Sequence, residues 1–125
     1  MAYLDISYPS GGDGPDGRPL GQDWADGPTS LADSYGWDPE RIVPGVDESD
    51  ILGVEAPLWT ETVTSLAEAE WLLFPRLAAV AEIAWSPAST ERDLAEFEGR
   101  LTAFRARLAA LGVACGGAAP APATA

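Results

Sequence analysis

The clearest hydrophobic pattern lies in residues 91–111, where apolar side chains recur at alternating intervals of three and four residues. This spacing is typical of one face of an α-helix, so we expect a long helix with Thr90 as its N-cap and Gly112 at its C-cap position. A coiled coil would use the same pattern, although about three heptads is near the lower limit for one. The apolar face comprises Leu94, Phe97, Leu101, Phe104, Leu108 and Leu111.

A second helical region precedes this one and contains a proline. Ser65 and Glu68 have the spacing of a capping box, which predicts a helix start near Leu66. Pro75 lacks an amide hydrogen and clashes with the preceding turn, so it should break or restart this helix. The residues expected to be buried between Pro75 and Pro87 are Leu77, Val80, Ala81, Ala84 and Trp85.

Two short segments have the composition of β-strands. Residues 3–8 alternate β-forming residues with small or acidic ones, and Pro9 then stops any pairing. Residues 51–56 form a short apolar run that contains Glu55. Because buried acids are normally paired, we expect a structural contact for Glu55, with Arg76 as the candidate partner. Strands and helices together predict a mixed α/β domain.

The connecting segments are rich in glycine and proline, since 13 glycines and 11 prolines occur among 125 residues. Residues 9–28 predict a long surface loop, residues 29–35 a short helix, and residues 37–44 a turn-rich connection. We expect one domain over residues 1–113. Residues 114–125 are a low-complexity tail with nothing to bury, so we expect them to be disordered.

The chain is strongly acidic, with a formal net charge of -13. Of its 20 acidic residues, 13 lie in the first 61 positions, which hold only two of the seven arginines. A nucleic-acid or anionic-membrane partner is disfavoured, because either would repel such a surface. Cys115 is the only cysteine and there is no histidine, which excludes an intrachain disulfide, a His-based metal site and a Ser-His-Asp triad within this sequence. No secretory signal opens the chain, and its location stays open.

Trp59 and Glu61 are the strongest candidates for chemistry. They lie two residues apart where the second predicted strand gives way to a helix, and alternate positions of a strand face the same side. An aromatic ring covers the apolar face of a sugar, and a carboxylate accepts hydrogen bonds from its hydroxyls. The pair therefore predicts a monosaccharide pocket. The alternative is a core tryptophan beside a solvated glutamate.

Residues 53–86, GVEAPLWTETVTSLAEAEWLLFPRLAAVAEIAWS, resemble the last strand and helix of the family 20 glycoside hydrolases, the β-N-acetylhexosaminidases. The opening Tyr3-Leu4-Asp5 resembles the end of that family's preceding strand. The resemblance implies an α/β fold: the C-terminal portion of a TIM (β/α)8 barrel, with its last two strands and helices, plus a C-terminal helix. At 125 residues the chain is about half of the roughly 250 that a complete barrel needs.

The same resemblance implies roles for five residues. Trp59 would form the pocket wall beside the N-acetyl group, and Glu61 would bind sugar hydroxyls. Tyr3 would donate a hydrogen bond to the acetamido oxygen and so stabilise it, while Asp5 would bind a hydroxyl on the far side of the sugar. Trp24 corresponds to a further aromatic residue on the loop between the two strands.

The family uses a substrate-assisted retaining mechanism. The acetamido oxygen of the substrate attacks the anomeric carbon, a glutamic acid protonates the leaving oxygen, and a neighbouring aspartate orients the acetamide. The family carries these two acids as an Asp-Glu dipeptide on a mid-barrel strand, and we expect this chain to begin after that strand. Asp47-Glu48 is an Asp-Glu dipeptide, but its polar turn lacks the apolar surroundings that raise an acid's pKa, so we expect no catalytic role there.

The expected function is therefore part of a β-N-acetylhexosaminidase-like hydrolase that removes terminal N-acetylhexosamine from glycans. Alone the chain is expected to be inactive and to need the remainder of the barrel. No cofactor or metal is expected, because residues 11–16 match only one copy of a calcium-binding repeat that requires tandem copies. Two alternatives remain open: a free-standing sugar-binding or dimerising domain that pairs through the helix at 91–111, and a truncated relic.

Overall fold

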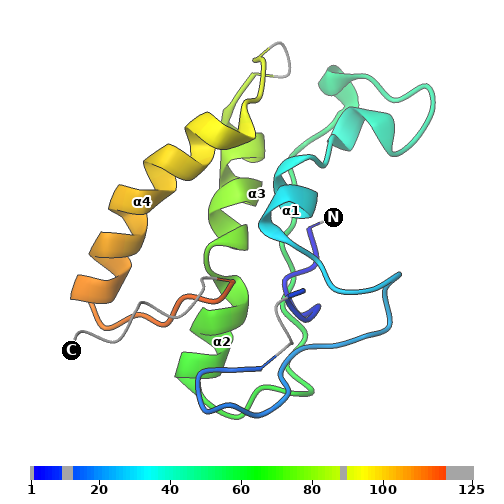
Figure 1. The fold of residues 1–125 in the computed structure, drawn as a ribbon. Helices are drawn as coiled ribbons and strands as arrows, with labels where there is room; N and C mark the ends of the chain where they lie inside the picture. The colour runs from blue at the N-terminus through cyan, green and yellow to red at the C-terminus, as the bar shows by residue number, and fades with distance from the viewer. Residues whose placement is uncertain (1, 10–12, 88–89, 118–125) are drawn as a thin grey trace.

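The structure, a computed structural model, describes residues 2–9, 13–87 and 90–117 (Figure 1). Within these ranges four α-helices and two short 3-10 helices follow one another, and no strand is formed. None of these helices is long and apolar enough to cross a membrane. The elements are α1 (Leu31–Tyr35), η1 (Pro39–Arg41), η2 (Glu48–Asp50), α2 (Leu66–Leu73), α3 (Arg76–Trp85) and α4 (Leu94–Ala110).

The break between α2 and α3 confirms the prediction made at Pro75. Ser65 Oγ accepts a hydrogen bond from the Glu68 N–H at 3.3 Å, and Glu68 Oε2 accepts one from the Ser65 N–H at 3.1 Å, so the predicted capping box forms. α2 ends at Leu73, and α3 begins at Arg76, directly after the residue that has no amide hydrogen. The two helices follow one another end to end through the middle of the molecule (Figure 1).

α4 confirms the long C-terminal helix but not its predicted cap. Asp93, and not Thr90, is the N-cap, because its carboxylate accepts the N–H groups of Ala95 and Glu96 at 2.9 and 3.3 Å. A carboxylate suits this end of a helix, where the backbone dipoles favour negative charge. Gly112 follows the helix with a φ of 74°, the left-handed conformation that ends many helices.

The hydrophobic core lies where α1, α3 and α4 meet, with α3 between the other two (Figure 1). Tyr35 stacks on Phe97 with ring centroids 4.5 Å apart, and Ala79 and Leu101 complete the cluster. The predicted buried face of α3 is only partly correct. Val80 is buried, but α1 and α4 pack against the face that carries Ala79, which leaves much of the predicted face outside. Its exposed members are Ala81, Ala84 and Trp85.

Arg76, the first residue of α3, is wholly buried and binds the backbone of three separate parts of the chain. Its Nη1 donates to the carbonyl oxygens of Ile6 at 2.7 Å and Thr29 at 3.2 Å. Its Nη2 donates to those of Leu4 at 2.6 Å and Leu72 at 3.1 Å. Burial disfavours the charged form and lowers the pKa of Arg76 from its usual value. The four carbonyl dipoles replace part of the lost hydration, and Nε has no hydrogen-bond partner among the described residues.

The strands predicted at residues 3–8 and 51–56 do not form in the part of the chain that the structure describes. A strand requires a ladder of backbone hydrogen bonds to a neighbour. The described backbone bonds include none between these two segments; the Leu4 N–H instead donates to the oxygen of Pro57, the residue after the second segment, at 2.9 Å. Carbonyl groups of the first segment bind Arg76 in place of a neighbouring strand.

The predicted contact of Glu55 with Arg76 is also wrong. Glu55 is exposed, whereas the guanidinium of Arg76 is bound by carbonyl oxygens. Leu52, in the same apolar run, is fully exposed as well. The run at 51–56 therefore presents apolar surface that the described residues do not cover.

The residues that follow α4 pack back against α2 and the first segment. The Gly116 N–H donates to the Phe74 oxygen at 2.9 Å. A Cβ added at Gly116 would lie 2.7 Å from the Tyr8 ring, so only glycine fits this approach. These contacts hold residues 114–117 of the predicted tail in place, whereas residues 118–125 lie outside the described residues together with the prediction made for them.

Replacing Arg76 with alanine is expected to lower the free energy of unfolding by about 3–5 kcal/mol, because four carbonyl oxygens lose a buried cationic donor. Urea denaturation followed by tryptophan fluorescence measures the change. The matched control is Arg107→Ala. Arg107 is exposed on α4, so this substitution should change the free energy of unfolding by less than about 0.5 kcal/mol. Similar small effects of both substitutions would contradict the role assigned to Arg76.

Candidate functional site

An open cleft of about 500 Å³ lies where three separated parts of the chain meet. Its size is within the range of small-molecule pockets, roughly 300–1,000 Å³. The residues that line it are Tyr3, Gln22, Trp24, Trp59 and Glu61. The cleft therefore brings aromatic rings, an amide and a carboxylate to one place.

Four of these five lining residues were predicted from the sequence, and the remaining predicted residue, Asp5, lies beneath the cleft. Asp5 is wholly buried, and its Oδ2 accepts a hydrogen bond from Trp24 Nε1 at 3.3 Å. The Trp24 ring meets the Tyr3 ring edge to face, with centroids 5.1 Å apart and an interplanar angle of 86°. Asp5 Oδ1 has no hydrogen-bond partner among the described residues. Asp5 thus orients one aromatic wall and retains an unused acceptor.

Gln22 is the cleft residue that the sequence analysis missed. Its Nε2 donates to Glu61 Oε2 at 3.1 Å, which joins two walls of the cleft. Its backbone is also fixed, because the Gln22 N–H donates to the Asp5 oxygen at 2.6 Å and the Ser7 N–H donates to the Gln22 oxygen at 3.1 Å. The available signal was its spacing from Trp24, since residues two apart in an extended segment face the same side.

Gly21 allows the loop to pass close to the first segment of the chain. Its φ of 96° lies in the left-handed region that side chains other than glycine rarely adopt. A Cβ added there would lie 2.7 Å from the Ser7 nitrogen and 3.0 Å from the Asp5 oxygen. Gly21 therefore determines how near Gln22 and the residues after it approach Asp5. Residues 10–12, the start of this loop, lie outside the described residues.

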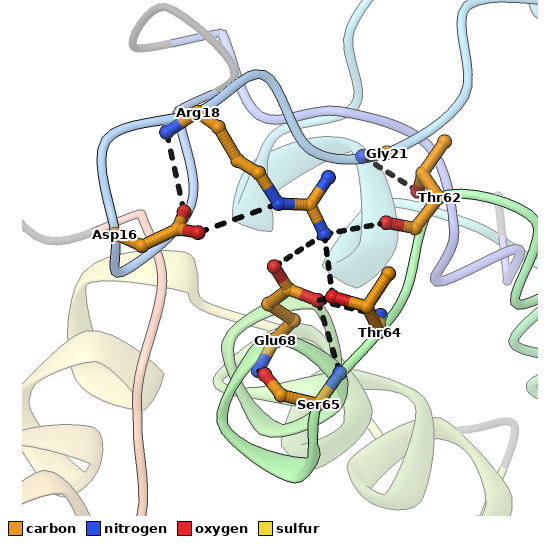
Figure 2. A network of polar contacts seen from close by, with 7 residues as sticks. All are labelled: Asp16, Arg18, Gly21, Thr62, Thr64, Ser65 and Glu68. Atoms are coloured by element: carbon orange, nitrogen blue, oxygen red, sulfur yellow. Dashed lines mark hydrogen bonds and ion pairs between the residues drawn. The ribbon is translucent and has the colours of Figure 1, made fainter.

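A polar network fastens the same loop to the residues that precede α2 (Figure 2). Arg18 Nη2 donates to the Thr62 oxygen at 2.9 Å and to Thr64 Oγ1 at 3.1 Å, and it forms an ion pair with Glu68 Oε1. Three residues further along the loop, the Gly21 N–H donates to Thr62 Oγ1 at 3.1 Å. The loop and the segment before α2 are therefore joined at two points.

Glu68 is the buried acid of this network. Its Oε2 accepts hydrogen bonds from the Thr64 N–H at 2.6 Å, from Thr64 Oγ1 at 3.0 Å and from the Ser65 N–H at 3.1 Å. The Thr64 N–H bond, and after it the Arg18 guanidinium, outweigh burial and lower the pKa of Glu68 from its usual value. The carboxylate is therefore ionised at neutral pH, as the ion pair with Arg18 requires.

Three acidic residues elsewhere in the described chain, Asp38, Glu40 and Glu48, line a separate hollow that has no aromatic residue in its lining. Asp47 is the N-cap of η2 and Glu48 is its first residue, and both are exposed, as expected for a polar turn. The separate hollow, of about 210 Å³, lies beside η1 and the end of α3, and it shares no lining residue with the cleft. The described residues contain no group of three or more His, Cys, Asp or Glu side chains that could hold a metal ion.

The catalytic-domain model of glycosyl hydrolase family 20 matches residues 1–88, a range that includes every residue of the cleft. The chain belongs to glycosyl hydrolase family 20. Its similarity to β-N-acetylhexosaminidase from Cellulomonas fimi is 46% identity over 100 residues, which is 80% of this chain and 18% of that protein. A β-hexosaminidase from Vibrio vulnificus is 43% identical over 49 residues, 39% of this chain and 6% of that one. The chain thus spans less than a fifth of either relative.

Solved structures of family 20 enzymes share the fold of this chain. A family 20 β-N-acetylglucosaminidase superposes with a TM-score of 0.81 at 45% identity, over 94% of this chain and 24% of that one. The family 20 β-N-acetylhexosaminidase from Streptomyces coelicolor A3(2) gives 0.79 at 39% identity, over 99% of this chain and 24% of that one. The N-acetyl-β-hexosaminidase from Streptomyces plicatus, in complex with Thio-NAglucal, superposes with a TM-score of 0.79 at 40% identity, over 99% of this chain and 23% of that one.

The fit of Gly21 in this family 20 chain can be tested by alanine substitution. Gly21→Ala should lower the free energy of unfolding by about 2–4 kcal/mol, because a clash at 2.7 Å adds to the strain of a left-handed φ. In Gly27→Ala, the matched control, φ is 117° but nothing lies within 4 Å of the added Cβ, so only the strain remains. Urea denaturation compares the two, and NMR should show the Trp24 indole resonance shifted in Gly21→Ala alone. Equal losses with an unmoved indole resonance would count against the close approach.

Proposed function

We propose that this chain forms one wall of the N-acetylhexosamine subsite in a family 20 β-N-acetylhexosaminidase, which removes terminal N-acetylhexosamine from glycans. The observation that carries the proposal is the cleft, where Tyr3, Trp24 and Trp59 lie around the carboxylate of Glu61. Rings and carboxylates in this combination suit the apolar face and the hydroxyls of a monosaccharide. The family and the names of the similar enzymes support the same substrate class.

The proposed contacts follow from how each side chain is presented. Trp59 is 56% exposed, so its ring is available to cover the sugar beside the N-acetyl group. Tyr3 is also exposed and would donate its hydroxyl to the acetamido oxygen, while Glu61 would accept from sugar hydroxyls. Asp5 has an unused oxygen, but because it is wholly buried, its contact with a hydroxyl requires the Trp24 ring to shift.

The reaction itself would depend on groups from another part of the enzyme. In the substrate-assisted mechanism the acetamido oxygen bonds to the anomeric carbon as the glycosidic bond breaks, and an acid gives its proton to the leaving oxygen. Water then attacks the anomeric carbon and returns a proton to the carboxylate of the acid, while the bond from that carbon to the acetamido oxygen breaks and restores the acetamido group. Asp47 and Glu48 are exposed in η2 and do not line the cleft, so we assign the acid and its orienting aspartate to residues outside this chain. The contribution of Tyr3 would be to stabilise the acetamido group during the attack.

We further propose that the chain is the C-terminal portion of the family's TIM barrel. Large apolar side chains remain exposed on several elements, as expected if another part of the enzyme covers them. The rest of the barrel is the natural cover, and its strands would supply the partners that the segments at 3–8 and 51–56 lack. Outside the cleft, the exposed large apolar residues among those described are Ile42, Val43, Leu52, Leu66, Trp85 and Leu111.

The alternative of a domain that dimerises through its last helix is weakened by the packing of α4. Phe97, Leu101 and Leu108, which lie on the predicted apolar stripe, are already buried within the chain. Leu111, at the end of the stripe, is exposed, but one residue is too small for a stable interface. The stripe therefore serves intrachain packing.

The sugar subsite is tested by titrating the chain with N-acetylglucosamine and following the tryptophan indole resonances by NMR. Trp59→Ala is expected to weaken binding at least about tenfold, which corresponds to about 1.4 kcal/mol. Trp85→Ala is the matched control, because Trp85 is 89% exposed and lies outside the cleft. Glucose, which lacks the acetamido group, should bind more weakly than N-acetylglucosamine. Absence of binding to the wild-type chain, or equal effects of the two substitutions, would refute the subsite.

A further inference from the structure

We propose that Arg18 is a positioning residue for the sugar subsite, which fixes Glu61 in the cleft by fastening the loop that carries Gln22 to the segment that follows Glu61. The proposal rests on the function proposed above. Arg18 does not line the cleft, so it would act through other residues and not by contact with the sugar.

The ion pair of Arg18 differs from an ordinary surface pair. The Arg18 side chain is 38% exposed, but that of Glu68 is only 3% exposed. Three further hydrogen bonds from Thr64 and Ser65 to Oε2 fix the orientation of the Glu68 carboxylate independently of Arg18. A pair between two mobile and exposed side chains would fix little.

The guanidinium also reaches the chain immediately beyond Glu61. Arg18 donates to the Thr62 oxygen at 2.9 Å, and the Gly21 N–H donates to Thr62 Oγ1 at 3.1 Å, as Figure 2 shows. Gln22 then donates to Glu61 itself at 3.1 Å. Three successive contacts therefore link the loop to two adjacent residues, and Glu61 is held through both its side chain and its neighbour.

The loop that carries Gln22 is also bonded to the first segment of the chain, at Asp5 and Ser7. The Gln22 N–H donates to the Asp5 oxygen at 2.6 Å, and the Gln22 oxygen accepts the Ser7 N–H at 3.1 Å. Gln22 thus stands between the two carboxylate residues of the proposed subsite. Because Arg18 fastens its loop to the Glu61 segment, the separation of Glu61 from Asp5 depends on a residue outside the cleft.

The test compares Arg18→Ala with Arg100→Ala. Arg100 makes a similar set of ion pairs, to Glu82 and Glu96, but joins α3 to α4 and lines no part of the cleft. Affinity for N-acetylglucosamine is measured by NMR titration, the Gln22 to Glu61 contact by the nuclear Overhauser effect from the Gln22 side-chain amide, and stability by urea denaturation. Arg18→Ala should weaken sugar binding about threefold to tenfold and remove the Gln22 to Glu61 contact. Arg100→Ala should leave both unchanged even where it lowers stability.

Two milder variants keep the test informative if Arg18→Ala does not fold. Arg18→Lys keeps the charge next to Glu68 but lacks the planar fork, so it should restore part of the affinity. Thr62→Val removes only the acceptor for the Gly21 N–H and should weaken binding less than Arg18→Ala does.

The outcomes separate this proposal from the one on which it rests. A Gln22 to Glu61 contact that persists in Arg18→Ala, or an affinity no lower than that of Arg100→Ala, overturns the positioning role. A wild-type chain that does not bind the sugar refutes the subsite, and the Gln22 to Glu61 contact then decides alone: its loss in Arg18→Ala supports the positioning of Glu61, and its retention overturns it.

Discussion

The guanidinium of Arg76 donates to carbonyl groups from the first segment of the chain, from Thr29 just before the N-cap of α1 and from the end of α2. A buried cation is stable only where its lost hydration is replaced, and here carbonyl dipoles replace part of it. Tyr8 completes the arrangement, since its ring lies 4.0 Å from the guanidinium carbon. Burial raises the pKa of Tyr8, so its hydroxyl stays protonated and donates to the Phe74 oxygen at 3.0 Å. The break at Pro75 leaves helix carbonyls unpaired, and these two side chains bind them.

The cleft depends on this arrangement because Tyr3, which lines it, and Asp5, which binds Trp24, belong to the segment that Arg76 fixes. The Leu4 and Ile6 carbonyls bind the guanidinium and flank Asp5, and Tyr3 lies one residue earlier. The loop then lies on this fixed segment, and Arg18 joins the loop to the chain beyond Glu61. Three segments that are distant in the sequence therefore meet through backbone carbonyls and one charged network, without a sheet. This accounts for a cleft lined by aromatic rings and a carboxylate in a chain that spans less than a fifth of its curated relatives.

Local signals in the sequence predicted the helices well, because caps and breaks depend on residues a few positions apart. The capping box before α2 and the interruption at Pro75 are of this kind. The strand predictions were wrong because a strand forms only beside a partner strand. The described residues provide no such partner for these segments, whose backbone groups bind Arg76 or make single hydrogen bonds instead. Tyr3 was predicted from the family resemblance, whereas Trp59 was predicted first from its position two residues before Glu61 and then from the resemblance. Gln22 and Arg18 were missed, since their importance comes from contacts across about forty positions that no periodicity reveals.

The most direct test of the account is a crystal structure of this chain with bound N-acetylglucosamine. The account predicts one sugar in the cleft, with its ring against Trp59 and a hydroxyl within hydrogen-bond distance of the Glu61 carboxylate, while the Arg76 contacts to the first segment stay in place. A sugar bound elsewhere, or a first segment released from Arg76 with the cleft still formed, would contradict it.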